Sequence, residues 1–216
     1  MKQRGFTIIE LIVVIVIIGI LTSLTTVQIV RSAAVARDKE RLDDVTTIAN
    51  HLENIYKTGQ PDGKLIPSGD TSVTTAVPMG YPSIAFINNP NDPQSKAIMS
   101  GLDERALFSP NKKTMSLVAA TSASGAIGNS AGGINISGSN DVYVYQPLSP
   151  QTTPSGTQDQ VCASANTPST QEVIAPRFAD TCVKFNIYYY SEVNNTVKTK
   201  QSINYGINGG DASNGL

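Results

Sequence analysis

Hydrophobic residues are concentrated at the start of the chain. Only three of the 16 residues from 6 to 21 are not apolar, and residues 6–30 carry a single charge. A helix of these 25 residues would be roughly 37 Å long, enough to cross a hydrocarbon core of about 30 Å. We therefore predict a membrane-spanning helix over residues 6–30.

The next segment, residues 31–58, holds 10 of the chain's 33 charges and has a helical period. Its apolar positions, which fit one buried stripe, are Leu42, Val45, Ile48, Ala49, Leu52, Ile55 and Tyr56. No proline or glycine occurs between Leu21 and Thr58, so the two segments are predicted to form one helix on the order of 80 Å long. Gly59 and Pro61 then end it.

Residues 59–216 are predicted to form a head of a different character. Residues 59–113 are loop-rich, with one short helix at about Ser95–Phe108, and residues 114–205 are rich in strands. Segments 182–190 and 196–205 form a predicted hairpin around Glu192–Asn195, and the last residues form a mobile tail. Within 141–146 valines and tyrosines alternate, and the run Tyr188–Tyr190 places rings on both faces of a strand. The fold class is α+β, a long helix packed on an antiparallel sheet.

Composition supports this division into an apolar end and a polar body. Residues 1–30 hold 18 of the 86 apolar residues, whereas Ser, Thr, Asn and Gly together number 74 of 216. This excludes one large aliphatic core and a multi-span membrane protein. The formal net charge is −1 with scattered cations, so we predict no nucleic-acid partner.

No catalytic constellation is recognisable, so we expect no enzyme activity and no cofactor. Nucleophile elbow, zinc-protease, EF-hand and phosphate-loop motifs are missing from the sequence. The adjacent acids Asp43/Asp44 and Asp103/Glu104 point to different faces of a helix and suit solvent. The single histidine, His51, is given no role, and two cysteines with one histidine make a zinc site improbable.

The first residues, MKQRG, give the helix an orientation. Lys2 and Arg4 place the N-terminus in the cytoplasm and the head outside. An ordinary secretory signal peptide is disfavoured because no small-x-small cleavage site follows Leu21 promptly. Glu10 is costly inside a membrane, about 2.5–3.5 kcal/mol at a helix centre, which indicates a partner for its carboxylate.

The segment GFTIIELIVVIVIIGIL resembles the N-terminal signature of type IV prepilins and pseudopilins. The resemblance covers about residues 1–30. It implies that a prepilin peptidase cuts between Gly5 and Phe6, removing the leader 1–5, and then N-methylates Phe6. It also implies that Glu10 supports subunit assembly. One departure is that many pilins have a proline where this chain has Val27, so melting of the helix near Gly19 is left open.

Cleavage would create an ammonium on Phe6. In a low-dielectric surrounding this ammonium can pair with Glu10 of a neighbouring subunit and set the axial register of two apolar helices. The alternative is that Glu10 only reaches the cytoplasmic headgroups. The mature chain would have a formal side-chain charge of −3, because Lys2 and Arg4 leave with the leader.

Cys162 and Cys182 enclose 19 residues. Because the head is placed outside the cytoplasm, we predict a disulfide between them, worth roughly 3 kcal/mol. The spacing also resembles the C-terminal disulfide-bounded loop of many pilins. Some secretion pseudopilins bind calcium in this region, but the acids here are scattered (Asp159, Asp180 and Asp211), and we predict no metal site.

The predicted function is that of a structural subunit of a type IV pilus-like filament. Its partners are itself and other pilins, the prepilin peptidase, the assembly machinery of the inner membrane and the membrane itself. The subunit is first a single-pass protein of the cytoplasmic membrane and then part of a filament at the cell surface. The alternatives are a minor pilin or type II secretion pseudopilin, and a membrane-anchored binding domain that never polymerises.

Overall fold

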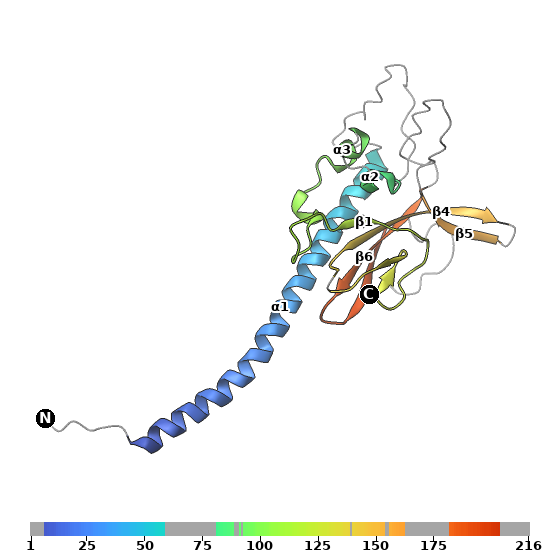
Figure 1. The fold of residues 1–216 in the computed structure, drawn as a ribbon. Coiled ribbons are helices and arrows are strands. Elements are labelled where there is room, and N and C mark those ends of the chain that lie inside the picture. Colours follow the sequence, from blue (N-terminus) through green and yellow to red (C-terminus); the bar gives the residue numbers. More distant parts are fainter. Residues whose placement is uncertain are drawn as a thin grey trace.

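The computed structural model describes residues 7–58, 81–88, 91, 93–138, 140–153, 156–162 and 182–203. The leader, Phe6, the segment 59–80, Asp180 and the tail with Asp211 lie outside these residues. The described part consists of one long helix and a head that holds a mixed sheet (Figure 1). The α+β class predicted from the sequence is confirmed.

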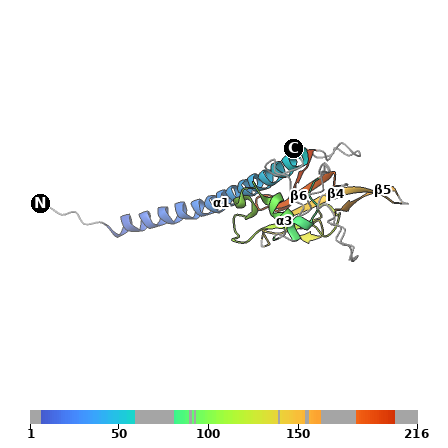
Figure 2. The same ribbon diagram turned by 90° about the horizontal axis from the view of Figure 1, so that it is seen from above.

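Helix α1 (Ile8–Thr58) is continuous over 51 residues, as predicted. Its N-terminal half projects from the head, and its C-terminal half lies against it (Figure 2). In the projecting half the large apolar side chains are exposed, from 47% at Val14 to 80% at Ile8. In the other half Val45, Ile48 and Ile55 are fully buried. The change from an all-round apolar to an amphipathic sequence therefore marks the point where the helix enters the head.

The main sheet has five strands in the order β1–β4–β6–β7, with β5 also paired to β4. The bounds are β1 (Leu117–Ala119), β4 (Tyr143–Thr153), β5 (Gly156–Val161), β6 (Lys184–Ser191) and β7 (Thr196–Gln201). A small second sheet pairs β2 (Ser130–Ala131) with β3 (Ile134–Asn135). The β6–β7 hairpin and its Glu192–Asn195 turn confirm the sequence prediction.

Both faces of the central strands β4 and β6 are covered. On one face Tyr143, Tyr145 and Phe185 belong to the core cluster that includes the buried residues of α1. On the other face Val144 and Tyr188 pack under residues of the loop between β1 and β4. Because side chains alternate along a strand, the tyrosine run of β6 is divided between the two clusters, as expected.

The sheet corrects two details of the prediction. Strand β1 pairs with β4 in parallel, not antiparallel, because the chain between them crosses the second face of the sheet instead of turning back in a hairpin. Strand β5 was not predicted, because residues 149–160 lack alternating apolar residues. It forms because β4 continues past the central sheet and pairs with the returning chain.

Two further predictions about helical segments need correction. The single helix expected at Ser95–Phe108 is divided into α3 (Pro93–Met99) and the 3₁₀ helix η2 (Glu104–Leu107), and Gly101 lies between them with φ of +80°. A short helix, α2 (Ala85–Asn88), precedes them. In the apolar stripe of α1, Leu42 is exposed, because the buried direction of the helix at this level passes through Arg41 and Val45.

Candidate assembly helix and its junction with the head

The N-terminus of α1 is closed by a capping box formed by Thr7 and Glu10. The Thr7 backbone N–H and hydroxyl donate to Glu10 Oε2 at 2.9 and 2.8 Å, and the Glu10 N–H donates to Thr7 Oγ1 at 3.4 Å. The sequence T-x-x-E at residues 7–10 is the signature of such a capping box. Both bonds from Thr7 go to Oε2 of Glu10, whose side chain is exposed.

By length and composition α1 is the one helix, among the described residues, that could span a membrane. None of its most apolar 18-residue window is buried within the chain. So large an apolar surface requires either lipid or other apolar helices around it.

The hydroxyl groups beyond Gly19 bond back to the helix. Thr22 Oγ1 donates to the Ile18 carbonyl at 2.6 Å, and Ser23 Oγ donates to the Ile20 carbonyl at 2.8 Å. Such bonds satisfy a polar group in apolar surroundings and compete with the main-chain ladder. The helix is nevertheless unbroken here.

Where α1 enters the head, Asp38 holds the β6–β7 turn. Its carboxylate accepts hydrogen bonds from Ser191 Oγ at 2.7 Å and from the backbone N–H groups of Glu192 and Val193 at 2.9 and 3.0 Å. Burial opposes the ionisation of Asp38, but these hydrogen bonds outweigh it and keep its pKa below the ordinary value. The turn is thereby fixed to the helix.

One helical turn further on, Arg41 is 1% exposed and is contacted by three carboxylates. Its Nε donates to Asp141 at 2.9 Å, its Nη1 to Asp38 at 3.0 Å and its Nη2 to Glu192 at 2.5 Å. Arg37 also contacts Glu192, with Nη2 to Oε2 at 2.6 Å. Hydrogen bonds from Arg37 lower the pKa of Glu192 to about 2 against the opposing effect of burial, and Arg41 adds to the lowering.

The spacing of Asp38 and Arg41 (i, i+3) alone would indicate a helix-face ion pair worth a few tenths of a kcal/mol. In the structure Arg41 is instead the buried centre of a network of three carboxylates.

Asp44, expected in solvent, is buried and faces the start of β4. The Tyr143 hydroxyl donates to Asp44 Oδ2 at 2.7 Å. Burial raises the pKa of Asp44 to about 6, and the hydrogen bond from Tyr143 only partly opposes this. Burial and the contact with Asp44 also raise the pKa of Tyr143 well above the ordinary value, which keeps its hydroxyl protonated as a donor.

Near the end of α1 a buried carboxylate, Glu53, joins two other segments of the head. The Tyr81 hydroxyl donates to both Glu53 oxygens at 3.0 and 2.9 Å, and the Ile203 N–H donates to Oε1 at 2.8 Å. His51, given no role from the sequence, has its Nε2 2.6 Å from the Ile98 carbonyl oxygen. This contact attaches α3 to the helix.

The disulfide anchors the segment before α2 to the sheet. Cys162 and Cys182 are joined, with Cα atoms 5.9 Å apart. The Tyr81 N–H donates to the Cys182 carbonyl at 2.8 Å, and the Ile84 N–H donates to the Cys162 carbonyl at 3.1 Å. The bridge therefore stands at the point where residues 81–84 meet the ends of β5 and β6.

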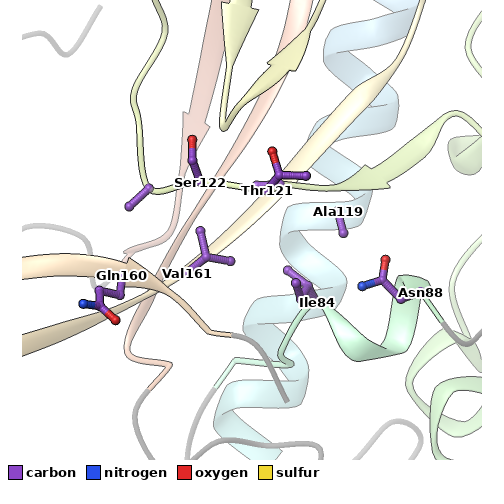
Figure 3. Close-up of a pocket in the computed structure, with 9 residues that line it drawn as sticks. Ile84, Asn88, Ala119, Thr121, Ser122, Gln160 and Val161 are labelled. Carbon is purple, nitrogen blue, oxygen red and sulfur yellow. The ribbon is translucent and has the colours of Figure 1, made fainter. Parts of the chain in front are cut away.

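A surface pocket of about 510 Å³ lies beside this point (Figure 3). Its lining consists of Ile84, Asn88, Ala119, Ala120, Thr121, Ser122, Ala123, Gln160 and Val161. Gln160 and Asn88 lie at opposite sides of the opening, with Val161 and Ile84 between them (Figure 3). These residues include no carboxylate, imidazole, thiol or amine, so we assign the pocket no acid–base chemistry.

No group of three or more candidate metal ligands occurs among the described residues. Of the three scattered acids considered for calcium, only Asp159 is described. It accepts from Lys184 Nζ at 2.7 Å.

Of the residues selected from the sequence, the structure describes Glu10, Cys162 and Cys182, whereas Gly5 and Phe6 lie outside the described part. The residues that the sequence reading missed are the polar anchors of the junction: Asp38 as a turn acceptor, Arg41, Asp44, Glu53, Asp141 and Glu192. The sequence carries a weak signal that Asp38 and Arg41 are buried, since they share one helix face with the apolar residues Val45 and Ile48.

Comparison with known proteins agrees with the N-terminal signature. The profile of the prokaryotic N-terminal methylation motif matches residues 1–26. The type II secretion system core protein G of Pectobacterium carotovorum subsp. carotovorum is 31% identical over 101 residues, which are 43% of this chain and 62% of the relative. The protein of the same name from Dickeya chrysanthemi is 32% identical over 101 residues, 43% of this chain and 63% of the relative.

The corresponding Escherichia coli (strain K12) protein is 41% identical over 56 residues, 26% of this chain and 38% of the relative. No solved structure matches significantly. The chain thus spans about three fifths of the length of the first curated relatives. The methylation motif and these relatives agree with the resemblance to type IV pilin-like proteins that the N-terminal residues carry, and the α+β layout with one long N-terminal helix is consistent with it.

Proposed function

We propose that this chain is a structural, non-enzymatic subunit of a pilin-like filament. It is held in a membrane by the apolar half of α1 before assembly, with its head outside the cytoplasm. The observation that carries the proposal is the exposure of the large apolar side chains described in that half, beside a head whose central strands β4 and β6 are covered on both faces. The head needs nothing from the apolar half for its own core, so this surface serves contacts with lipid and then with other subunits.

Processing precedes assembly. Prepilin peptidase cleaves between Gly5 and Phe6 and N-methylates Phe6, and the subunit then joins others through the assembly machinery of the membrane. The methylation motif over residues 1–26 supports this step. Cleavage leaves Thr7 and Glu10 in the mature chain, so their capping box is retained.

Glu10 supplies the register of the filament. Its carboxylate is fixed by Thr7 through Oε2, and Oε1 accepts the ammonium of Phe6 from a neighbouring subunit. Away from water an unpaired carboxylate is strongly unfavourable, so helices that slide out of this register lose the pair without compensation.

Two measurements test the proposal. Mass spectrometry of the membrane-extracted protein should show a chain that begins at methylated Phe6. An intact Met1, or a cut beyond Leu21, would exclude processing of this type. In cells, Glu10→Ala should leave a processed, membrane-bound protein that is missing from sheared filaments.

Asp43→Ala is the matched control for Glu10→Ala. Asp43 is an exposed carboxylate on the same helix, outside the apolar half. The Asp43→Ala protein should enter filaments at the wild-type level. Normal incorporation of Glu10→Ala would contradict the pairing, and the lack of any filament that contains the wild-type protein would favour a non-polymerising anchored domain.

A second candidate is the more specific role of a type II secretion pseudopilin, which the names of the relatives favour. A major pilus subunit should dominate sheared surface filaments. A pseudopilin should instead be scarce there, and its deletion should block secretion of an exported protein. A minor pilin should be scarce in sheared filaments without such a secretion defect.

A further inference from the structure

An open groove lies on the flank of α1, where the helix meets the β6–β7 hairpin. Its volume is about 260 Å³. Apolar side chains of Val35, Leu42, Tyr189 and Val193 line it, and Lys39 and Lys198 also border it. Leu42 is 46% exposed and Val193 is 41% exposed, although the neighbouring Arg41 is buried. Two large apolar side chains are thus left uncovered beside a tightly bonded junction.

The groove lies on the same helix face as Glu10. At about 100° per residue, Glu10, Val13, Ile17, Val35 and Leu42 fall within a sector of roughly 60° around α1. The helix is continuous between them, and Leu42 lies about 48 Å along the axis from Glu10. A second helix that contacts Glu10 and runs parallel to α1 along this face would therefore also contact the groove.

We propose that the groove receives the α1 helix of a second copy of this chain, at about residues 31–38. The inference rests on the proposed function, because the Phe6–Glu10 pair sets the offset of the two copies. Phe6 of the neighbour lies level with Glu10 of the first copy. Each residue of the neighbour therefore faces the residue of the first copy whose number is four higher. Residues 31–38 of the neighbour then face residues 35–42, which form the helical wall of the groove.

The occupant suits a narrow groove. Ser32, Ala33 and Ala36 are small and exposed, so the neighbouring backbone can approach closely. The contact also joins two different surfaces, the groove of one copy and the helix of the next. Such a head-to-tail contact does not close on itself in a pair and so extends into an open helical polymer.

Cysteine cross-linking within assembled filaments tests the contact. Leu42→Cys is combined in turn with Ser32→Cys, Ala33→Cys, Ala34→Cys, Val35→Cys or Ala36→Cys, which together sample all sides of the helix. Each pair lies at least six residues apart on one helix, about 9 Å, so a disulfide within one chain is excluded. At least one pair should give a ladder of disulfide-linked subunits, and adding Glu10→Ala should abolish it.

Ile127→Cys replaces Leu42→Cys in the matched control. Ile127 is 75% exposed on the loop between β1 and β2 and is not among the residues that line the groove, so it should give no ladder. Filaments that form while every Leu42 pair stays monomeric would overturn the groove proposal and leave the proposed function standing. If no filament contains the protein, both proposals fail together.

Substitution gives an independent measurement. Leu42→Asp and Val193→Asp each place a charge in the groove and should reduce the filament-incorporated fraction about tenfold. Both side chains are substantially exposed, so the fold should tolerate the change. Ile127→Asp should assemble as the wild type does. Unchanged incorporation of both groove variants would contradict the docking.

Discussion

Arg41 and Asp141 form a buried ion pair that joins the long helix to the start of β4, with Arg41 Nε and Asp141 Oδ1 2.9 Å apart. Asp141 has a φ of +45°, a conformation that few residues other than glycine adopt. The same guanidinium also contacts Asp38 and Glu192. One side chain of α1 therefore connects a helix, a strand end and a hairpin turn, and its removal leaves acids buried without a counter-charge.

Arg41→Met should reduce the free energy of unfolding by about 3–5 kcal/mol, because Asp141 and its neighbouring carboxylates lose their central cation. Denaturant titration of the full chain in detergent measures the loss. Arg105→Met is the control, since Arg105 forms an exposed pair with Glu40 and should change stability by about 1 kcal/mol or less. Equal effects of the two substitutions would show that burial of Arg41 is energetically irrelevant.

Because of Asp44, the free energy of unfolding should fall as the pH rises from about 4 to about 6. Its pKa is about 6 in the folded protein and 3.8 in an unperturbed chain, so the folded state binds this proton more tightly. Ionisation consequently weakens the fold as pH rises through that window, by up to about 3 kcal/mol, and has no further effect above it.

Asp44→Asn should remove that fall, and unfolding titrations at pH 4, 5, 6 and 7 measure it. Asp38 and Glu192 have lowered pKa values, so their contribution is lost at lower pH, as the pH falls below about 4. Asp43→Asn, at an exposed neighbouring position, should retain the wild-type profile. Parallel pH profiles for Asp44→Asn and wild type would contradict the assignment.

Asp38→Ala should loosen the β6–β7 turn selectively. The amides of Glu192 and Val193 lose a charged acceptor, so their hydrogen exchange should accelerate about tenfold to a hundredfold. The Ser202 amide, which donates to the Phe185 carbonyl at the other end of the hairpin, is the internal control. A uniform acceleration at all three amides would indicate global destabilisation instead of a local latch.

Removal of the disulfide by Cys162→Ser together with Cys182→Ser should lower the free energy of unfolding by roughly 3 kcal/mol, as expected for a loop of this length. Thermal unfolding of the full chain measures the change. Reduction of the wild type should reproduce it, while the double variant should be insensitive to reductant. A double variant as stable as the oxidised wild type would contradict the prediction.

The long helix and the β6–β7 hairpin could be predicted because their signals are local. Apolar periodicity gives the helix, and alternating strands around a polar turn give the hairpin. The burial of Arg41 could not be predicted in this way, since its partners Asp141 and Glu192 are 100 and 151 residues away in the chain. A charged residue is favourable in a core only when such partners are present, and a local pattern cannot show them.

The same limit explains the exposed Leu42 and the missed β5. Leu42 fits the apolar stripe, but the position of the head around the helix decides which edge of the stripe is covered. Strand β5 has a polar sequence and depends on backbone pairing with β4. At the N-terminus, by contrast, the candidate functional residues Gly5, Phe6 and Glu10 lie within the first 30 positions, where the sequence alone identifies them.

The polar anchors along α1 also determine how the subunit carries mechanical load. Asp38, Arg41, Asp44 and Glu53 contact the head at successive levels over about 22 Å of one rigid helix. A pull along the helix axis is resisted by all of these contacts at once, in shear, so no single bond has to carry the whole force. A pull directed sideways at the β6–β7 turn meets Asp38 and Glu192 first. The junction is consequently strongest along the direction in which a filament would be stretched.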